Sequence, residues 1–322
     1  MVTRCRKIMK KVSLFLILIL IATFFVTGCG EKTPKSQYTQ LFHENEQLSY
    51  YGETSSQGVP NGFGTEYDKY GNIIYQGYWK DGSYHGSGEW FASGILVYSG
   101  AFENGYKTGQ GKRYHPNKKV QYEGAFANNL EYGFGKEYDT KGNIIYEGNY
   151  LNGKKTGQGK FYYSNGSLAY EGAVKDNLKE GEGSLYNVER FLQYQGTFKR
   201  DKLSGNGIEF YKNGRIKFNG VFKDNLYSQG KLYRENEVLL FEGSFVNNSY
   251  KKGLLYNEQG ILVYNGEFHN TTYDGKGILY GANDMIIYEG EFRAGLYHGK
   301  GSLYNPDGSV QREGEFINGQ PK

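Results

Sequence analysis

Hydrophobic and polar residues alternate along most of the chain in a pattern that restarts about every 24 residues. The stretch from Tyr146 to Gly172, YEGNYLNGKKTGQGKFYYSNGSLAYEG, begins and ends with the same triplet, Tyr-Glu-Gly. The glycine of this triplet marks each repeat and is called the reference glycine. Twelve reference glycines follow one another at intervals of 23 to 25 residues: Gly52, Gly77, Gly100, Gly124, Gly148, Gly172, Gly196, Gly220, Gly243, Gly266, Gly290 and Gly314. Such a regular restart predicts a repeat protein in which each unit is one supersecondary structure.

Apolar residues occupy alternate positions around each reference glycine. An aliphatic residue stands four positions before it, and Tyr or Phe stands two positions before it in every unit except the last, which has Arg312. An aromatic residue usually follows two positions after it, with Thr54 and Val174 as exceptions, and the positions between are mostly polar. Period two predicts a β-strand with one apolar and one solvated face. Because glycine inside a strand costs about 0.5–1 kcal/mol, we expect it to make room for an aromatic ring from a neighbouring strand.

A second signature, Gly-x-Gly-x-x-aromatic, follows nine to twelve residues later and predicts a second strand. It is seen in Gly157, Gly159 and Tyr162, whereas the eighth and ninth units carry Ser228 and Lys251 in place of the first glycine. Asn-Gly and Asp-Gly pairs between the two signatures favour tight hairpin turns. Each unit is therefore predicted to be one β-hairpin. Because an isolated hairpin is marginally stable at best, we expect stacking of successive hairpins to stabilise the fold.

These units resemble the MORN repeat, whose pattern opens Tyr-x-Gly and continues Gly-x-x-x-Gly-x-Gly. The segment from Tyr288 to Tyr304, YEGEFRAGLYHGKGSLY, matches it closely, and the resemblance covers roughly residues 48 to 319. It implies an all-β protein: an elongated single-layer antiparallel meander, or β-hairpin repeat solenoid, with twelve repeats in residues 48–322. Two strands per unit give a body about 110 Å long. The histidine of the pattern is kept only at His85 and His298, so no role common to all units is expected for it.

The N-terminus has the features of a secretory signal. Five basic residues precede an uncharged apolar run from Val12 to Val26, which predicts a signal helix and a signal peptide over residues 1–28. The following VTGC resembles the bacterial lipobox, which implies cleavage before Cys29 and lipidation of its sulfur; the alternative is an ordinary signal peptide with an isolated cysteine. Residues 29–47 are interpreted as the lipidated cysteine and a flexible spacer. The protein is thus expected on the extracytoplasmic face of the cell membrane, anchored by lipid.

Composition and charge argue against several functional classes. The chain has 48 Gly, 32 Tyr and only 5 Pro, which favours many short strands over helices or disorder. Loss of the five basic residues in residues 1–28 takes the formal net charge from +4 to −1. A nearly neutral body provides no overall electrostatic attraction for nucleic acid, and it weakens the case for lipid headgroup binding.

No group of residues in the sequence has the spacing of a catalytic or metal site. The five histidines are scattered, and neither a P-loop nor a full Gly-x-Gly-x-x-Gly motif is present. Glu123, Glu147 and Glu171 recur in step beside the reference glycines, which predicts a solvated ladder on the polar face. We therefore expect no enzyme, no metal, and no cofactor besides the covalent lipid on Cys29.

The remaining candidate for function is the aromatic surface, because a one-layer sheet has no second layer to cover its apolar side. Exposed apolar patches mark interaction sites, although the rings can instead pack on one another along the sheet. The main hypothesis is a non-catalytic protein interaction scaffold at the cell envelope. The alternative is a carbohydrate-binding module for peptidoglycan or another surface glycan. The candidate surface residues are Tyr75, Trp79, Trp90, Tyr98, Tyr122, Tyr146, Tyr170, Tyr194, Tyr264 and Tyr288.

Overall fold

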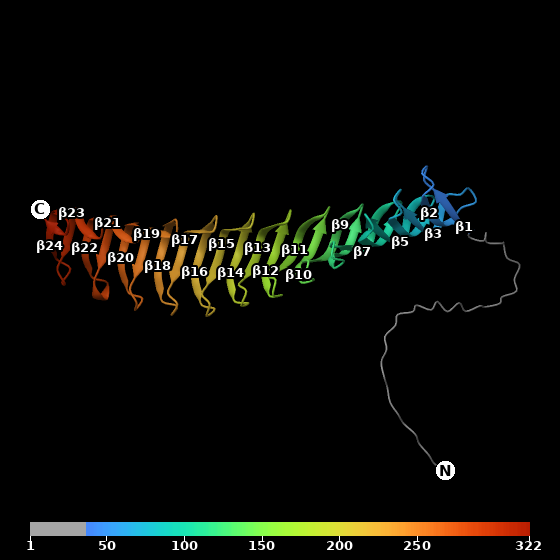
Figure 1. Ribbon diagram of the computed structural model, residues 1–322. Coiled ribbons are helices and arrows are strands. Elements are labelled where there is room, and N and C mark those ends of the chain that lie inside the picture. Colours follow the sequence, from blue (N-terminus) through green and yellow to red (C-terminus); the bar gives the residue numbers. More distant parts are fainter. Residues whose placement is uncertain (1–36) are drawn as a thin grey trace, which may run out of the picture. The chain divides into compact units, whose positions relative to one another are not determined.

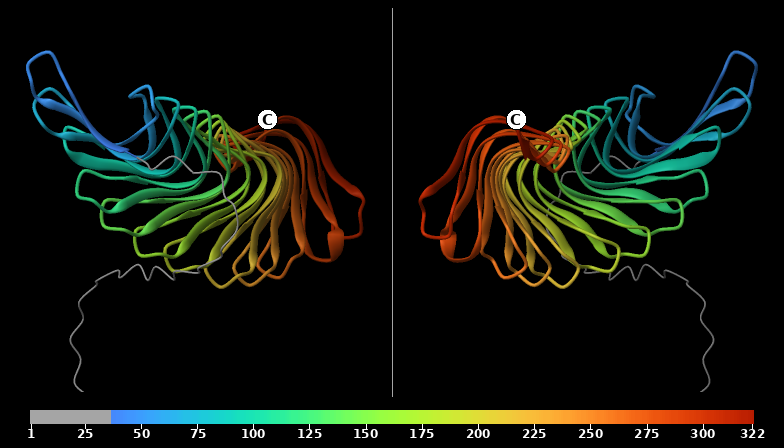
Figure 2. Two further views of the ribbon diagram at one scale, coloured as in Figure 1. Left: turned by 90° about the vertical axis from the view of Figure 1, so that its right-hand side faces the viewer. Right: turned by 90° about the vertical axis from the view of Figure 1, so that its left-hand side faces the viewer.

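The computed structural model describes residues 37–322, which form one open antiparallel sheet (Figure 1). Each strand pairs with the strand that follows it in sequence, as expected for a meander. Views along the sheet show successive hairpins fanning out as the twist accumulates (Figure 2). The predicted all-β single-layer architecture is confirmed. The predicted signal helix and the lipidation site Cys29 lie outside the described residues.

The described part of the chain contains 25 strands and one short 3₁₀ helix. Their bounds are β1 (Gln37–Phe42), β2 (Leu48–Thr54), β3 (Pro60–Tyr67), β4 (Ile73–Lys80), β5 (Ser83–Ala92), β6 (Ile95–Glu103), β7 (Tyr106–Tyr114), β8 (Val120–Ala127), β9 (Leu130–Tyr138), β10 (Ile144–Leu151), β11 (Lys154–Tyr162), β12 (Leu168–Lys175), β13 (Leu178–Tyr186), β14 (Leu192–Lys199), β15 (Lys202–Phe210), β16 (Ile216–Lys223), β17 (Leu226–Tyr233), β18 (Leu239–Val246), β19 (Ser249–Tyr256), β20 (Leu262–His269), β21 (Thr272–Tyr280), η1 (Ala282–Asp284), β22 (Ile286–Arg293), β23 (Leu296–Tyr304), β24 (Val310–Ile317) and β25 (Gln320–Pro321).

Each repeat unit is one hairpin, with the reference glycine on the first strand and the Gly-x-Gly signature on the second. In the fifth unit β10 and β11 are joined by Asn152 and Gly153, whose φ angles are 50° and 77°. These left-handed conformations suit Asn and Gly and explain why the pair recurs at the tips of the hairpins.

An unbroken row of glycines crosses the sheet from β2 to β24. Gly148, for example, lies opposite Gly135 on one side and Gly159 on the other. A Cβ atom at Gly159 would lie 2.5 Å from the hydroxyl oxygen of Tyr146, which belongs to the adjacent strand. The row therefore has no side chains because tyrosine rings lie flat over its backbone. The predicted ring-over-glycine packing is confirmed.

A β-bulge follows the reference glycine in every unit except the last, and it explains the recurring spacing of the second signature. In the sixth unit Gly172 pairs with Gly183 and Val174 pairs with Lys179, so three residues of β13 face Ala173 alone. The hydroxyl of Tyr170 donates a hydrogen bond to the carbonyl oxygen of Ala173 at 2.8 Å. Equivalent bonds from a tyrosine to the carbonyl three residues later are made by Tyr50, Tyr75, Tyr98, Tyr122, Tyr146, Tyr194, Tyr264 and Tyr288.

The eighth and ninth units show what happens when this bulge is smaller. In the eighth unit Val221 pairs with Gln229 and Phe222 pairs with Tyr227, so only Ser228 is left over. This unit has Phe218 where other units have the hydroxyl-bearing tyrosine, and the ninth unit has the same combination of short bulge and phenylalanine. These units therefore show one linked structural change: the first glycine of the second signature, one residue of the spacing and the tyrosine hydroxyl are lost together.

Two sequence predictions need correction. The aliphatic residues four positions before the reference glycines do not share the face of the tyrosines, because a bulge intervenes: Leu168 lies opposite Tyr162, whose hydroxyl reaches Glu147 on the polar face at 2.5 Å. None of these aliphatic side chains packs against the aromatic core. The flexible spacer predicted for residues 29–47 is wrong for Gln37–Phe42, because this segment forms β1 and pairs with β2.

Candidate functional site

The core of the protein is a continuous row of aromatic rings on one side of the sheet, called the aromatic face here. The ring of Tyr98 makes edge-to-face contacts with Phe102 of its own unit and Phe126 of the next, at centroid distances of 5.1 and 5.0 Å. The same alternation continues through most of the units, with Tyr122 contacting Phe126 and Tyr150 at 5.2 and 5.1 Å. Such edge-to-face pairs add about 0.5–1.5 kcal/mol each beyond the burial of apolar area.

The predicted interaction surface is mostly this core, and the prediction that it is exposed is wrong. Trp79 is 8% exposed, the tyrosines are at most 1% exposed, and only Trp90 is half-buried. The rings lie flat on the glycine row and are covered by side chains of the following strand, so they pack on one another. The buried residues of the predicted set are Tyr75, Trp79, Tyr98, Tyr122, Tyr146, Tyr170, Tyr194, Tyr264 and Tyr288.

The covering side chain stands seven residues after the reference glycine and differs between the ends and the middle of the sheet. Near the N-terminal end it is Tyr84, which stacks on Tyr75 at a centroid distance of 3.8 Å and an angle of 9°. Toward the C-terminal end Tyr227, Tyr250, Tyr273 and Tyr297 stack in the same way on the core rings of their units. The third to sixth units instead carry charged residues at this position: Lys107, Glu131, Lys155 and Lys179.

Five of the charged residues on the aromatic face form what we call the central charged cluster: Lys107, Arg113, Glu131, Glu137 and Lys155. The Arg113 guanidinium pairs with the Glu131 carboxylate, and the Lys155 ammonium lies 2.6 Å from Glu137 Oε2. The side chain of Glu131 is 9% exposed and that of Lys155 is 19% exposed. These ion pairs are therefore partly desolvated, unlike ordinary surface pairs.

The lysines of the cluster replace the missing aromatic covers by lying over the core rings. Lys107 Nζ lies 4.4 Å from the ring centroid of Trp90 and 5.0 Å from that of Tyr98, and Lys155 Nζ lies 4.8 Å from that of Tyr146. Burial lowers the pKa of Lys107, and the nearby Arg113 charge lowers it further. Cation–π contacts of this kind contribute about 0.5–2 kcal/mol depending on desolvation.

Among the described residues, three buried polar atoms in this region have no hydrogen-bond partner. They are Nε of Arg113, Oε2 of Glu137, whose contact with Lys155 is an ion pair, and the hydroxyl of Tyr150, a residue that is only 6% exposed. Burial raises the pKa of Tyr150, and the negative charge of Glu137 raises it further. Unpaired buried donors are rare in native proteins. The cluster therefore has hydrogen-bonding capacity that the chain itself does not use.

The sequence contained a signal for this cluster that the repeat pattern alone did not use. Charged residues stand at positions where other units have Tyr or Leu, and Tyr150 stands where most units have Phe. The sequence prediction was based on the residues that the repeats share. The residues of the cluster differ from this shared pattern, and the difference is the signal that identifies them.

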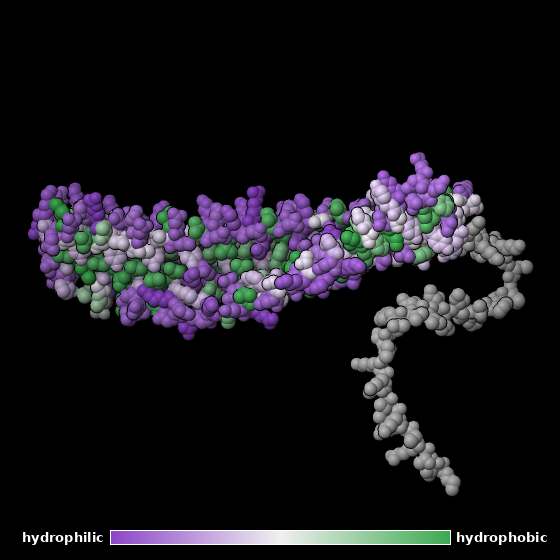
Figure 3. Space-filling view, in the orientation of Figure 1, coloured by the Kyte–Doolittle hydropathy of each residue, from purple (hydrophilic) through white to green (hydrophobic). Residues whose placement is uncertain are grey.

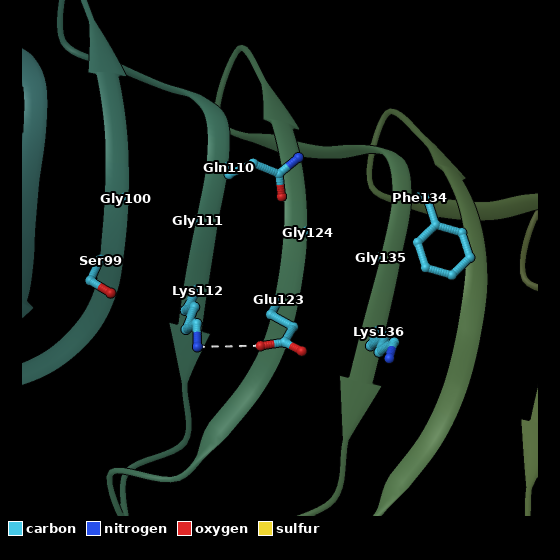
Figure 4. A pocket seen from close by; sticks show the side chains of 10 residues that line it. All are labelled: Ser99, Gly100, Gln110, Gly111, Lys112, Glu123, Gly124, Phe134, Gly135 and Lys136. Carbon is cyan, nitrogen blue, oxygen red and sulfur yellow. Dashed lines mark ion pairs between the residues drawn. The ribbon is translucent and has the colours of Figure 1, made fainter.

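The opposite side of the sheet, called the polar face, carries shallow hollows along the glycine row. One hollow of about 550 Å³ lies over Gly100, Gly111, Gly124 and Gly135 (Figure 4). It shares Phe134 with a neighbouring hollow of about 300 Å³. The hollows lie between side chains that flank the glycine row on this face, such as Gln110, Lys112 and Phe134. Figure 3 shows the surface as a central band of hydrophobic and near-neutral residues between hydrophilic borders.

One wall of these hollows is the predicted ladder of glutamates, which is confirmed and is interleaved with lysines. Lys112 Nζ lies 3.3 Å from Glu123 Oε2, and Lys136 Nζ lies 4.0 Å from Glu147 Oε2. The hydroxyl of Tyr138 donates to Glu123 at 2.6 Å, and this bond, with the lysine charges, holds the pKa of Glu123 below its usual range. Alternating charges along the wall neutralise one another, so the ladder is a structural feature of the polar face.

Exposed aromatic rings also occur on the polar face, mainly near the N-terminal end. Phe63 and Tyr78 are 38% and 53% exposed and meet edge-to-face at a centroid distance of 5.6 Å. They line a hollow of about 370 Å³ together with Gln76 and Glu89. Phe134, 57% exposed, lies farther along the same face.

The described residues offer no arrangement typical of a metal site. No group of three or more His, Cys, Asp or Glu side chains there lies close enough to hold a metal ion. His43 and His115 instead donate hydrogen bonds through Nε2 to backbone carbonyls of the next unit, each at 2.9 Å. Within residues 37–322 no helix has the length and hydrophobicity needed to cross a membrane.

No curated protein matches the chain. Among solved structures, one titled "Crystal Structure of TcdB2-TccC3" aligns at 13% identity over 87% of this chain and 18% of that chain, with a TM-score of 0.18, too low to support an argument.

The MORN repeat model matches eight segments, and the structure explains the longest gap between them. The matched residues are 75–95, 98–120, 122–144, 146–168, 170–187, 194–214, 264–285 and 288–310. The gap between residues 214 and 264 contains the eighth and ninth units, whose short bulges change the spacing of the pattern. Since the matches cover more than half of the sequence, the chain belongs to the MORN repeat family.

Proposed function

We propose that this protein is a non-catalytic, lipid-anchored scaffold on the extracytoplasmic face of the cell membrane, and that it binds a protein partner through the central charged cluster. The family is generally a non-enzymatic repeat or binding module. The observation that supports the site is the replacement of stacked aromatic covers by charged residues in the middle of the sheet, around Lys107, Glu131 and Lys155.

This replacement is evidence of function because it works against the stability of the repeat. A stacked tyrosine covers a core ring without desolvating any charge, whereas a partly buried ion pair gains little net stability. Positions where a sequence breaks its own structural rule are expected at functional sites. Arg and aromatic residues at partly desolvated positions are also the residues that dominate binding energy in protein interfaces.

The unused hydrogen-bonding groups of the cluster indicate the chemistry of the partner. A partner group that accepts from Arg113 Nε and bonds with the hydroxyl of Tyr150 satisfies two donors that are otherwise unpaired. A carboxylate or backbone carbonyl has this capacity, and charge-assisted bonds of this kind are the stronger class. We therefore expect an acidic or carbonyl-rich segment of the partner to dock over β7–β11.

The test replaces the charged covers by the residue that other units carry. A variant with Lys107→Tyr, Glu131→Tyr and Lys155→Tyr should keep its fold and lose its partner in cross-linking and pull-down from native envelope. The matched control is Lys154→Tyr, which changes an exposed neighbour of the cluster that forms an ion pair with Asp176 at 3.4 Å and none with the cluster. Unchanged partner capture by the triple variant would contradict the proposed site.

The lipid anchor has a separate test, because it depends on residues outside the described part of the chain. Cys29→Ser should abolish incorporation of labelled palmitate and release the protein from the membrane fraction. The matched control, Cys5→Ser, should leave both unchanged because this residue lies in the predicted signal peptide. Membrane retention of the Cys29→Ser variant would contradict a lipid anchor.

A second candidate function is glycan binding, now on the polar face instead of the buried aromatic face. The exposed rings of Phe63 and Tyr78 beside Gln76 and Glu89 support it, because a sugar ring can stack on an aromatic side chain while polar groups bond its hydroxyls. Co-sedimentation with purified cell wall should then fall in a Tyr78→Ala variant and persist in a Tyr106→Ala variant, which removes an exposed ring that does not line this hollow. Equal sedimentation of both variants would argue against this candidate.

A further inference from the structure

The two edges of the sheet differ in their chemistry. The N-terminal edge is β1, whose sequence QYTQLF has no charge and no proline, and which pairs with β2 alone among the described strands. The C-terminal edge is formed by β24, which carries Arg312, Glu313 and Glu315, and by the short β25, which ends at Pro321. Charge and proline protect an edge from pairing, whereas an uncharged edge strand is a template for another strand.

The C-terminal edge is also partly covered by the end of the chain. The backbone N–H of Lys322 donates to the carbonyl oxygen of Glu315 at 2.8 Å, and its ammonium lies 2.7 Å from the Glu315 carboxylate. β25 pairs with Phe316 and Ile317. The last residues thus occupy part of the backbone that a further strand would need, and β1 is the edge open to association.

The side chains of β1 are divided between the two faces of the sheet. Leu41 lies opposite Tyr50 and packs against the aromatic core. Tyr38 and Phe42 point to the polar face, where they are 55% and 59% exposed, and Tyr38 contacts Tyr51 at a centroid distance of 5.8 Å. An edge strand that carries two half-exposed rings leaves apolar area that a further strand would cover.

We propose that β1 pairs antiparallel with β1 of a second copy about a twofold axis at Gln40, which joins two sheets end to end. Directly opposite residues in an antiparallel pair point to the same face, so a twofold axis through a residue keeps both aromatic faces on one side. This register places Tyr38 opposite Phe42 of the second copy on the polar face, twice by symmetry. It also places Thr39 opposite Leu41 on the aromatic face, in line with the core.

Self-complementarity is the reason for choosing a second copy as the occupant. Two aromatic cross-strand pairs and two Thr–Leu pairs form from one uncharged six-residue strand, and directly opposed pairs of this kind stabilise antiparallel sheets. The interface is closed, because both copies use the same strand and, within the described residues, the C-terminal edge is protected from pairing. A single strand pair is a small interface, so confinement of both copies at one surface would favour it by raising their effective concentration.

The first test is residue-specific cross-linking of the full chain in cell membranes, with Cys5→Ser as the background. Cys29 is kept, because its proposed lipid holds the protein at the membrane and leaves no free thiol at this position, and the parent chain without a new cysteine is the blank. Gln40→Cys places one cysteine at the proposed axis, and a short bis-maleimide reagent should convert most of the protein to a covalent dimer. Two control positions are Gln320→Cys, at the opposite edge, and Asn45→Cys, which is equally close to the N-terminus but lies in the turn after β1. Both should cross-link at least tenfold less.

The second test measures the length of the assembly and its dependence on the edge. The full chain purified in detergent should sediment as a dimer whose longest dimension, by electron microscopy, is twice that of one sheet of about 115 Å. Gln40→Lys sets two like charges face to face and should give monomers, while Gln320→Lys should not. A monomeric parent chain, a dimer no longer than one copy, equal cross-linking at the control positions, or an intact Gln40→Lys dimer would each overturn the proposal.

Discussion

The bond from each core tyrosine to the bulged carbonyl is the interaction whose contribution can be tested most directly. In the sixth unit the hydroxyl of Tyr170, a side chain with no exposed area, donates to the Ala173 carbonyl oxygen at 2.8 Å. Tyr170→Phe removes the hydroxyl donor and leaves the Ala173 carbonyl oxygen without this hydrogen bond. We expect a cost of about 1–2 kcal/mol, because removing one partner of a buried hydrogen bond leaves the other unsatisfied.

The eighth unit shows how the chain accommodates phenylalanine at this position, and it suggests the matched second change. Deletion of Gly181 shortens the bulge of the sixth unit to the spacing found around Ser228, where Phe218 takes the place of the tyrosine. In a chain that keeps Tyr170, the deletion should destabilise the hairpin strongly, because the tyrosine hydroxyl then collides with the backbone of the glycine row. In the Tyr170→Phe variant the same deletion should destabilise the hairpin less. The double variant should therefore be about 1–2 kcal/mol more stable than the sum of the two single changes predicts.

Hydrogen exchange followed by mass spectrometry is the suitable assay, because units of a repeat protein contact only their neighbours and unfold locally. Tyr170→Phe should lower the protection of amides in β12 and β13 by about 5- to 30-fold, the equivalent of 1–2 kcal/mol. Amides in β20 and β21 provide an internal control. If the two changes are additive within about 0.5 kcal/mol, the proposed link between hydroxyl and bulge is incorrect.

Three further predictions concern the glycine row and the titratable groups. Gly183→Ala should destabilise its hairpin by about 1–3 kcal/mol, because a Cβ atom there lies 2.4 Å from a tyrosine hydroxyl oxygen. At Gly281 the nearest atom to a Cβ is a side-chain atom of Ile287 at 3.2 Å, so Gly281→Ala should cost less in the same exchange experiment. The pKa of Glu123 lies below its ordinary value of 4.5 in the folded protein, so the ionised carboxylate stabilises the fold above pH 4.5. This stability is lost as the pH falls through the lowered pKa. The thermal unfolding temperature of the Glu123→Gln variant should therefore depend less on acid pH. Burial raises the pKa of Tyr98 from 10.0 to about 12, so stability should fall as the pH rises through that range, and tyrosinate absorbance should appear together with unfolding.

The repeat architecture was predictable from sequence because its determinants are local. The spacing of the reference glycines, the alternation around them and the Asn-Gly turns specify one hairpin per unit, and identical neighbours leave sequential pairing as the way to bury the rings. The glycine was correctly predicted to lie under a ring, since no other role justifies its cost inside a strand. These inferences needed only the order of residues within one unit.

What the sequence pattern did not settle was which side of the sheet each residue occupies and what covers it. A bulge reverses the alternation, so Leu168 lies on the face opposite Tyr170 although two positions separate them. The exposed surface expected from the tyrosines is a buried core, because side chains from the following strand close over it. Strand β1 was missed because a single strand at an edge has no repeat to identify it.

The sequence by itself therefore determined the repeat, its hairpins and its family, because these depend on spacing within about 24 residues. Tertiary structure decided where the chain departs from its own pattern. Lys107, Arg113, Glu131, Glu137 and Lys155 come from three successive units, and only the stacking of those units brings their charges within ion-pair and ring-contact distance. Their grouping depends on strand register and on the bulges, which act between strands and are not written in the alternation of any single strand.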